Sequence, residues 1–482
     1  MRARRPALAF KPAADLVVQI NHVKLELDLF GSTAQRVYMA STPDKPLTHL
    51  SVLRIAVPIM LSNVTEPLIG VVNTTVIGQM PQPHLIGGVA VGSLIFSFLF
   101  WGFGFLRLST SGLSAQATGA RNSPEIAALI WRSLIISIAI GLALLALSPV
   151  IKPLAVALMG GSADVQSAAA TYFSYRIFAA PAALANFAML GWFVGQGRIG
   201  MVMVTQLTLS AINMALSALF VLYFNLGIAG VGLAVLIAEY SAVAIGLLFV
   251  LARLKAIGGG FDSKSIFDVE KLKTLVVSNL DMMIRTLCLL FAFAWFTSRG
   301  ARAGDTVIAA NTVLLHLFDV AAFLIDGFAY AAEALVGQAI GAKNRTRYAK
   351  AILLSSIWTM AFGFAAAVII WFTGPSLINL MTVNAEVREL ALQFLPWAAM
   401  APFLGAACFL YDGIFVGAMA TREMRNMMVL SLFIYLGASH FLEIAYGNHG
   451  LWAALCIFFI ARSASFAARL PSIKRGLFPH TA

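Results

Sequence analysis

Five carboxylates lie inside long apolar stretches of the sequence, where an acid could exchange a proton or bind a cation. A charged side chain at the centre of a bilayer costs about 2.5–3.5 kcal/mol on insertion scales, so such residues are candidates for function. The five are Glu66, Asp281, Asp326, Glu333 and Asp412. Each could instead satisfy a neighbouring helix end by hydrogen bonding, without any role in ion exchange.

Asp326 and Glu333 form the leading candidate site for ion coupling and cation recognition. They are seven residues apart, close to two helical turns, which predicts that both lie on one helix face. Asp326 is followed by glycine, and Asp412 repeats this Asp-Gly arrangement in YDGIF. Both Asp-Gly pairs could be ion sites or helix breaks.

Basic and polar residues are the next candidates. Asp281 and Arg285 are one turn apart and could pair on one face, either as a structural pair or as a switch. Arg176 could balance a carboxylate or extend to the membrane interface. Glu239 is a further candidate, and His316 titrates near neutrality, although a lone histidine is more often a hydrogen-bonded structural residue.

The sequence shows no motif that indicates an enzymatic or metal site. It has no HExxH or GxSxG motif and no cluster of histidines and cysteines. Cys288, Cys408 and Cys456 lie in apolar stretches without CxxC spacing, so they are predicted to be packing residues. We therefore expect no catalytic residue, metal site or cofactor.

The amino-acid composition indicates the class of protein in which these candidate residues lie. The chain of 482 residues is 60% hydrophobic and 11% charged, against about 25% charged in soluble domains. Its mean hydropathy is +0.87. A net charge of +12 could suggest nucleic acid, but the Lys and Arg residues lie in short segments between apolar runs. The sequence predicts an all-α integral membrane protein with no nucleic-acid partner.

Apolar runs of about 20 residues or more, enough to cross a bilayer, recur twelve times. They are predicted at 52–79, 87–117, 125–155, 166–196, 200–224, 228–254, 272–299, 306–339, 348–373, 385–416, 424–446 and 449–469.

Loop charges predict the orientation of these spans. Basic residues such as Arg121, Arg198 and Lys343 fall in alternate loops. The loops on the opposite side are poor in basic residues, with the exceptions Lys152, Arg299, Arg302 and Arg388. By the positive-inside rule, both termini are predicted to be cytoplasmic, in a multi-pass protein of the inner (plasma) membrane.

An internal repeat relates the two halves of the chain. LSTSGLSAQATGARN (108–122) aligns with YAAEALVGQAIGAKN (330–344), matching Gln116 to Gln338 and Gly119 to Gly341. Each copy ends the second span of a six-span half, so the halves are parallel repeats about an axis along the membrane normal. Two such halves can rock against each other to give alternating access.

The predicted organisation follows. Residues 1–48 form a cytoplasmic extension, and the part before Met39 is expected to be disordered or absent from the native protein. An N-lobe spans 49–255, a cytoplasmic linker 256–271, a C-lobe 272–470 and a cytoplasmic tail 471–482.

Six segments resemble the MATE transporter family, and within it the DinF branch. They are LRIAVPIMLSNVTEPLIGVVNTTVIG (53–78), FSFLFWGFGFLRLSTSGLSAQATGA (96–120), YRIFAAPAALANFAMLGWFVGQGR (175–198), LDMMIRTLCL (280–289), DGFAYAAEALVGQAIGA (326–342) and YDGIFVGAMATREMRN (411–426). The resemblance covers roughly residues 50–470. It implies twelve helices in two lobes and export of amphipathic or cationic compounds in exchange for H⁺ or Na⁺.

The N-lobe departs from the family pattern. Where relatives commonly carry an acid in a VDTxxIG-like pattern, this chain has Asn73, and an expected N-x-x-x-D reads Asn213 and Ser217. A polar site of Asn73, Asn186, Asn213 and Ser217 could bind Na⁺ through neutral oxygens but could not titrate. Glu66, two turns before Asn73, could replace the missing acid.

The leading functional prediction is a cation-driven exporter of amphipathic or cationic organic compounds, monomeric and surrounded by lipid. The mid-span acids outnumber Arg176 and Arg285, which favours cationic cargo. Alternatives are a flippase-like transporter of a lipid-linked precursor, which a basic cavity would favour, and an uncoupled or non-transporting family member.

Overall fold

The structure, a computed structural model, describes residues 46–80, 83–159 and 162–479. Within these ranges the regular elements are helices, with no strand. The predicted extension before residue 46, including the question of Met39, lies outside the described residues.

The twelve predicted spans are confirmed as helices long and apolar enough to cross a membrane. In the N-terminal half they are α2 (His49–Gly78), α3 with α4 (Pro83–Trp101 and Phe105–Gly119), α5 (Ser123–Met159), α6 with α7 (Ala163–Arg176 and Ala180–Gly195), α8 (Ile199–Ala218) and α9 (Gly227–Ala256). In the C-terminal half they are α11 (Val269–Arg302), α12 (Asp305–Gly341), α13 (Arg345–Met381), α14 (Ala385–Gly417), α15 (Thr421–Tyr446) and α16 (Asn448–Leu477). The short elements are the 3₁₀ turn η2 (Ile177–Ala179), the π-helical turn η3 (Leu219–Tyr223) and α10 (Ser263–Ile266).

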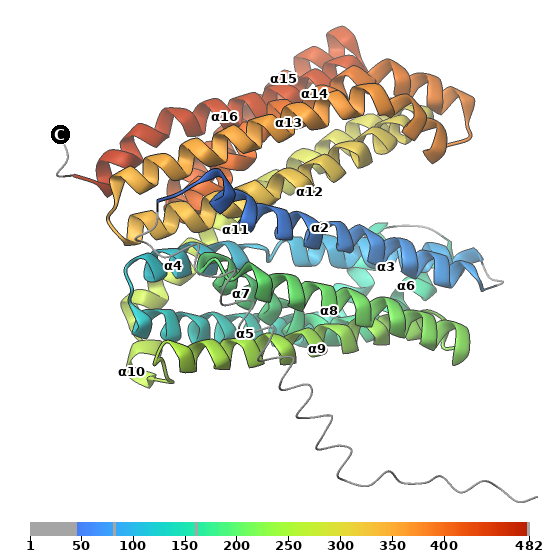
Figure 1. Cartoon of the computed structure of the whole chain (residues 1–482). Coiled ribbons are helices and arrows are strands. Elements are labelled where there is room, and N and C mark those ends of the chain that lie inside the picture. Colours follow the sequence, from blue (N-terminus) through green and yellow to red (C-terminus); the bar gives the residue numbers. More distant parts are fainter. Residues whose placement is uncertain (1–45, 81–82, 160–161, 480–482) are drawn as a thin grey trace, which may run out of the picture. The chain divides into compact units, whose positions relative to one another are not determined.

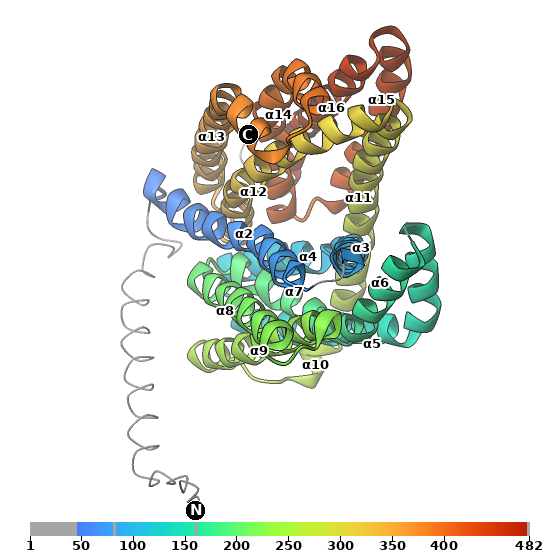
Figure 2. The same cartoon turned by 90° about the vertical axis from the view of Figure 1, so that its right-hand side faces the viewer.

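The two halves meet through a few central helices. Figures 1 and 2 show α12–α16 on one side, α5, α8 and α9 on the other, and α2, α3 and α4 between them. Within the N-terminal half, α7 packs against α4 and α5, and α2 against α8. The helix α12 packs against α13 and α14 of its own half and against α2 and α4 of the other. Residues on α4 and α12 are therefore positioned between the halves.

Large apolar side chains are exposed on the outer helices, as expected of a surface that contacts lipid. Leu158 of α5, Phe372 of α13 and Phe441 of α15 are each more than seven-tenths exposed. The three cysteines are free, with Cys408 and Cys456 buried.

The linker between the halves is attached to α5 by a buried arginine. Arg132 is 2% exposed, and its Nη1 donates to Glu125 Oε1 at 2.7 Å. Its Nη2 donates to the Ser265 carbonyl at 2.8 Å, and its Nε to the Ile266 carbonyl at 3.1 Å. Lys271, at the start of α11, also donates to Glu125. The predicted linker is thus held against the N-terminal half.

Replacing Arg132 by methionine is expected to lower the free energy of unfolding by about 2–4 kcal/mol, because Glu125 loses its buried partner and two carbonyls lose a charged donor. Thermal unfolding of the detergent-purified protein measures this. The matched control Lys271→Met removes an exposed partner of the same carboxylate, and we expect about 0–1 kcal/mol. Equal effects of the two variants would contradict the buried attachment.

Candidate functional site

The two copies of the internal repeat contact each other directly at one end of the helix bundle. Gly119 lies against the backbone of Gln338, where a Cβ atom would be 2.0 Å from the carbonyl oxygen. Gly341 lies in the same way against Gln116, at 1.9 Å. No residue with a side chain fits at either place. The absence of a Cβ therefore allows α4 and α12 to touch.

Two glutamines of the repeats add hydrogen bonds across the same contact. Gln116 Nε2 donates to the Gly417 carbonyl at the end of α14, at 2.9 Å. Gln338 Nε2 donates to the Gly195 carbonyl at the end of α7, at 3.0 Å. Gln116 and Gln338 occupy matching positions in the two repeats, so the contact is symmetric. We call Gln116, Gln338, Gly119 and Gly341 the closed end.

An ion pair links the halves next to the closed end. Arg107 of α4 lies 3.7 Å (Nη1 to Oε2) from Glu333 of α12, whose side chain is 1% exposed. The Arg107 guanidinium also stacks over the Tyr330 ring, 4.2 Å from its centroid. Arg107 was missed as a site residue, although it stands in an apolar stretch, as Arg176 does. Its position in FGFLRLST was the available signal.

Asp326 lies within electrostatic range of the same guanidinium. Arg107 interacts electrostatically with Glu333 and with Asp326, which agrees with the prediction that both acids share a face of α12. Asp326 also lies within electrostatic range of Asp412, Arg285 and Arg462. Asp326 is thus placed between the Arg107–Glu333 pair and a second group of charges in the C-terminal half.

That second group joins three helices. Asp412 of α14 accepts hydrogen bonds from Arg285 of α11 and from Arg462 of α16, the latter at 2.7 Å. Arg462 is fully buried and lies beside the rings of Phe409 and Phe458. Asp412 is therefore the partner of two arginines. The predicted helix break is wrong for both Asp-Gly pairs, since α12 and α14 continue through them, and the contacts of Asp412 are those of a structural ion pair.

The predicted pairing of Asp281 with Arg285 is wrong. Asp281 accepts from Arg425 Nη1 at 2.6 Å and from Thr421 Oγ1 at 2.9 Å, both on α15. Arg285 instead donates to Asp412. Spacing along one helix permitted the predicted pair, but α14 and α15 supply the partners that are used.

Double-mutant cycles test this partner exchange. We expect a coupling energy of about 1–3 kcal/mol between Arg285 and Asp412, and of less than about 0.5 kcal/mol between Asp281 and Arg285, because only the first two share a hydrogen bond. Thermal stability of Asp412→Asn, Asp281→Asn, Arg285→Gln and the two double variants provides both energies. A larger coupling for Asp281 with Arg285 would refute the assignment.

The charge balance at the centre also differs from the prediction. The acids Asp326, Glu333 and Asp412 are accompanied by Arg107, Arg285 and Arg462. The expected excess of acids over arginines is therefore absent from this group, since two of these arginines were not counted.

In the N-terminal half, the predicted polar residues pair in part. Asn73 Nδ2 donates to Asn213 Oδ1 at 3.3 Å, and both side chains are buried. Asn186 Nδ2 donates to Glu239 Oε2 at 2.7 Å. Ser217 is buried, and its hydroxyl has no hydrogen-bond partner among the described residues. Glu239 is thus a partner of Asn186, which the sequence did not indicate.

The remaining candidates lie elsewhere. Glu66 belongs to α2, but its side chain lies outside the described part. Arg176 Nη1 donates to Tyr172 Oη at 2.7 Å and its guanidinium lies over the Phe96 ring. His316 is exposed on α12 and interacts with Asp319, a mid-span acid that the sequence analysis did not single out. Among the described residues, no three His, Cys, Asp or Glu side chains are placed to hold a metal ion.

Twelve helices long and apolar enough to cross a membrane, in two related halves with charged residues between them, define a multi-pass membrane protein of the transporter type. The chain belongs to the MATE family, since the MatE family model matches residues 58–251 and 282–440. It is a transporter family, so the expectation that the protein is not an enzyme is confirmed.

Similar proteins support the DinF-like assignment. The chain is 36% identical over 435 residues to DNA damage-inducible protein F of Escherichia coli, covering 89% of this chain and 92% of that protein. It is 24% identical over 352 residues to a probable multidrug resistance protein NorM of Acinetobacter baylyi, covering 71% and 77%. It is 21% identical over 423 residues to human multidrug and toxin extrusion protein 1, covering 86% and 73%.

Solved structures share the fold. A MOP-superfamily transporter from Pyrococcus furiosus, described as having a binding pocket of reversed polarity, matches with a TM-score of 0.81 and 17% identity, over 90% of this chain and 97% of that one. A MATE transporter in an outward-facing conformation matches with a TM-score of 0.79 and 18% identity, over 88% and 96%.

Proposed function

We propose that this protein exports amphipathic and cationic organic compounds in exchange for H⁺ or Na⁺, by alternating access between its two halves. The observation that carries this proposal is the pair of Arg107 with the buried Glu333, which joins the halves. Glu333 can hold Arg107 or a cation. A proton, Na⁺ or cationic substrate that reaches Glu333 weakens its attraction to Arg107, and so weakens the contact between the halves.

The coupling site we propose is Glu333 with Asp326 in the C-terminal half. The N-terminal pair Asn73–Asn213 has no group that titrates near neutral pH, so it supplies at most neutral oxygen ligands to Na⁺. Asp281 and Asp412 are held by arginines, which supports structural roles for them. The proposal includes the predicted lobes, the linker and a monomeric state.

The orientation we propose places both termini in the cytoplasm. The basic residues Arg121, Arg198 and Lys343 directly follow α4, α7 and α12 at the closed end. By the positive-inside rule this is the cytoplasmic side. The halves are then in contact on the cytoplasmic side, as an exporter requires before releasing its cargo outward.

Proteoliposome transport tests this function. A fluorescent cationic dye should move in response to an imposed H⁺ or Na⁺ gradient, and only in liposomes that contain the protein. The ion whose gradient drives the dye is the coupling ion. If neither gradient moves the dye in the wild type but both do in Asn73→Asp, the native chain is uncoupled and the antiport proposal fails.

A lipid-linked or anionic cargo is the second candidate, because Arg107, Arg285 and Arg462 balance the central acids. Transport of a fluorescent anionic lipid under the same gradients, without transport of the cationic dye, would favour it.

A further inference from the structure

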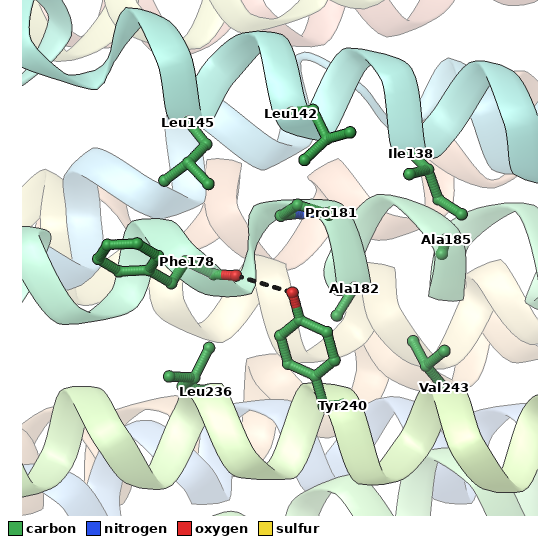
Figure 3. A pocket seen from close by; sticks show the side chains of 10 residues that line it. All are labelled: Ile138, Leu142, Leu145, Phe178, Pro181, Ala182, Ala185, Leu236, Tyr240 and Val243. Atoms are coloured by element: carbon green, nitrogen blue, oxygen red, sulfur yellow. Dashed lines mark hydrogen bonds between the residues drawn. The ribbon is translucent and has the colours of Figure 1, made fainter.

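An apolar crevice opens on the outer surface of the N-terminal half, away from the buried charges. Figure 3 shows side chains of α5, of the η2–α7 segment and of α9 converging on it. Its volume is about 550 Å³, within the range of ligand-binding pockets. The rim residues Leu142 and Tyr240 are 53% and 48% exposed, so the crevice is open to the surrounding lipid.

The sequence explains why the crevice is there. Gly141 lets α5 touch Pro181, where a Cβ atom would lie 2.4 Å from the proline Cα. The floor behind this contact consists of small residues of α7, Ala182 and Ala185. The larger side chains of α5 and α9 extend beyond these alanines and form the two walls of the crevice.

One backbone carbonyl at the helix break is hydrogen-bonded within the crevice. Pro181 has no N–H, and the chain forms the 3₁₀ turn η2 just before it. The Phe178 carbonyl at this break accepts a hydrogen bond from Tyr240 Oη at 3.2 Å (Figure 3). The remaining lining is apolar, so the crevice suits a hydrocarbon chain.

A positive charge lies on α5 beyond one end of the crevice. Ile138, Leu142 and Leu145 line the α5 wall, and Lys152 lies two turns beyond Leu145 on the same helix face. Lys152 Nζ donates to Ser174 Oγ of α6 at 3.3 Å. An ammonium has three donors, and within the described residues this is its one hydrogen bond. Lys152 is also a basic exception on the side that is otherwise poor in basic residues.

The spacing along α5 places Lys152 at one membrane interface. Arg132, which contacts the linker, and Lys152 are separated on α5 by about 20 residues, or roughly 30 Å, the thickness of the hydrocarbon core. Lys152 thus lies at the interface opposite the linker. The crevice begins about 10 Å below Lys152, where the lower part of an acyl chain would run if its phosphate contacted that ammonium.

We propose that this crevice binds one anionic phospholipid, with an acyl chain between α5, α7 and α9 and its phosphate at Lys152. The charge at Lys152 favours an anionic headgroup over a zwitterionic or cationic one. This site is distinct from the central charges, and its proposal does not depend on the transported compound.

Native mass spectrometry of the full-length protein tests the site with palmitoyl-oleoyl phosphatidylglycerol and its phosphatidylcholine counterpart. We expect wild type to retain phosphatidylglycerol about tenfold better, the worth of one charge-assisted hydrogen bond. Lys152→Gln should remove this preference. Ala182→Leu, which fills the crevice from its floor, and Val243→Phe, which fills it from the α9 wall, should each lose both lipids.

Matched controls are Lys264→Gln, a basic residue at the linker, and Leu248→Phe, an exposed residue elsewhere on α9; both should bind like wild type. Gel filtration identifies a crevice variant that fails to fold. In that case the other crevice variant tests the proposal. Retention unchanged in Lys152→Gln and in the folded crevice variants would overturn the proposal. So would displacement of the lipid by an equal concentration of inorganic phosphate, which would indicate an anion site without a hydrocarbon component.

Discussion

Glu333→Gln is expected to abolish gradient-driven transport of the cationic dye while the protein stays folded. Glutamine keeps the size of Glu333 and one acceptor oxygen, but it neither titrates nor carries the charge that attracts Arg107. The pair joins α4 and α12, so its loss removes the link between cation binding and the contact of the halves. Coupling free energies of 1–3 kcal/mol correspond to a decrease of about 5- to 150-fold in the stimulation by the gradient.

The control is Glu443→Gln. Glu443 accepts from Arg299 at 2.7 Å and, like Glu333, is a membrane-helix carboxylate beside an arginine, but its partner is in the same half. We expect near wild-type transport from it. Dye uptake in proteoliposomes with and without the gradient is the measurement.

Two further variants separate the roles of Glu333. If the double variant Arg107→Gln, Glu333→Gln regains dye counterflow without a gradient but not gradient-driven uptake, the ion pair sets the contact and Glu333 sets the coupling. Wild-type behaviour of Glu333→Gln together with inactivity of Asp326→Asn would move the coupling site to Asp326. Wild-type behaviour of both variants would exclude the C-terminal acids as the coupling site.

Gly341→Val is expected to stop transport by preventing closure between the halves. A Cβ atom at Gly341 would lie 1.9 Å from the Gln116 carbonyl oxygen. Backbone atoms cannot move aside as a flexible side chain can, so α4 and α12 must separate at the closed end. Overpacking of this kind costs about 1–3 kcal/mol, which raises the ratio of open to closed protein about 5- to 150-fold.

Cysteine accessibility measures this shift. In a background without the three native cysteines, Ala115→Cys places a thiol at a fully buried position that contacts Gly337. We expect a maleimide to label this thiol at least about tenfold faster when Gly341→Val is present. Gly437→Val is the control, because a Cβ there meets no atom within 4 Å. Active transport by Gly341→Val, with the introduced thiol still protected, would show that the closed end is not part of the cycle.

Local sequence features were enough to predict the fold. Twelve apolar runs predicted twelve spans, because a bilayer imposes the length and apolarity of every crossing segment regardless of its neighbours. The internal repeat predicted two related halves. It matched Gly119 to Gly341, but it did not predict that each of these glycines lies against the other repeat.

The site was determined by tertiary structure. Spacing within α11 predicted that Asp281 pairs with Arg285. In the folded chain Asp281 pairs with a residue of α15 and Arg285 with a residue of α14, because packing brings these two helices beside α11. Arg107 and Arg462 stand in apolar stretches, so the sequence could have marked them as candidate residues in the same way as Arg176. Their partners Glu333 and Asp412, however, follow from packing alone. Insertion into the membrane depends on each segment's own composition, whereas charge pairing depends on which segments meet, and only the folded chain decides that.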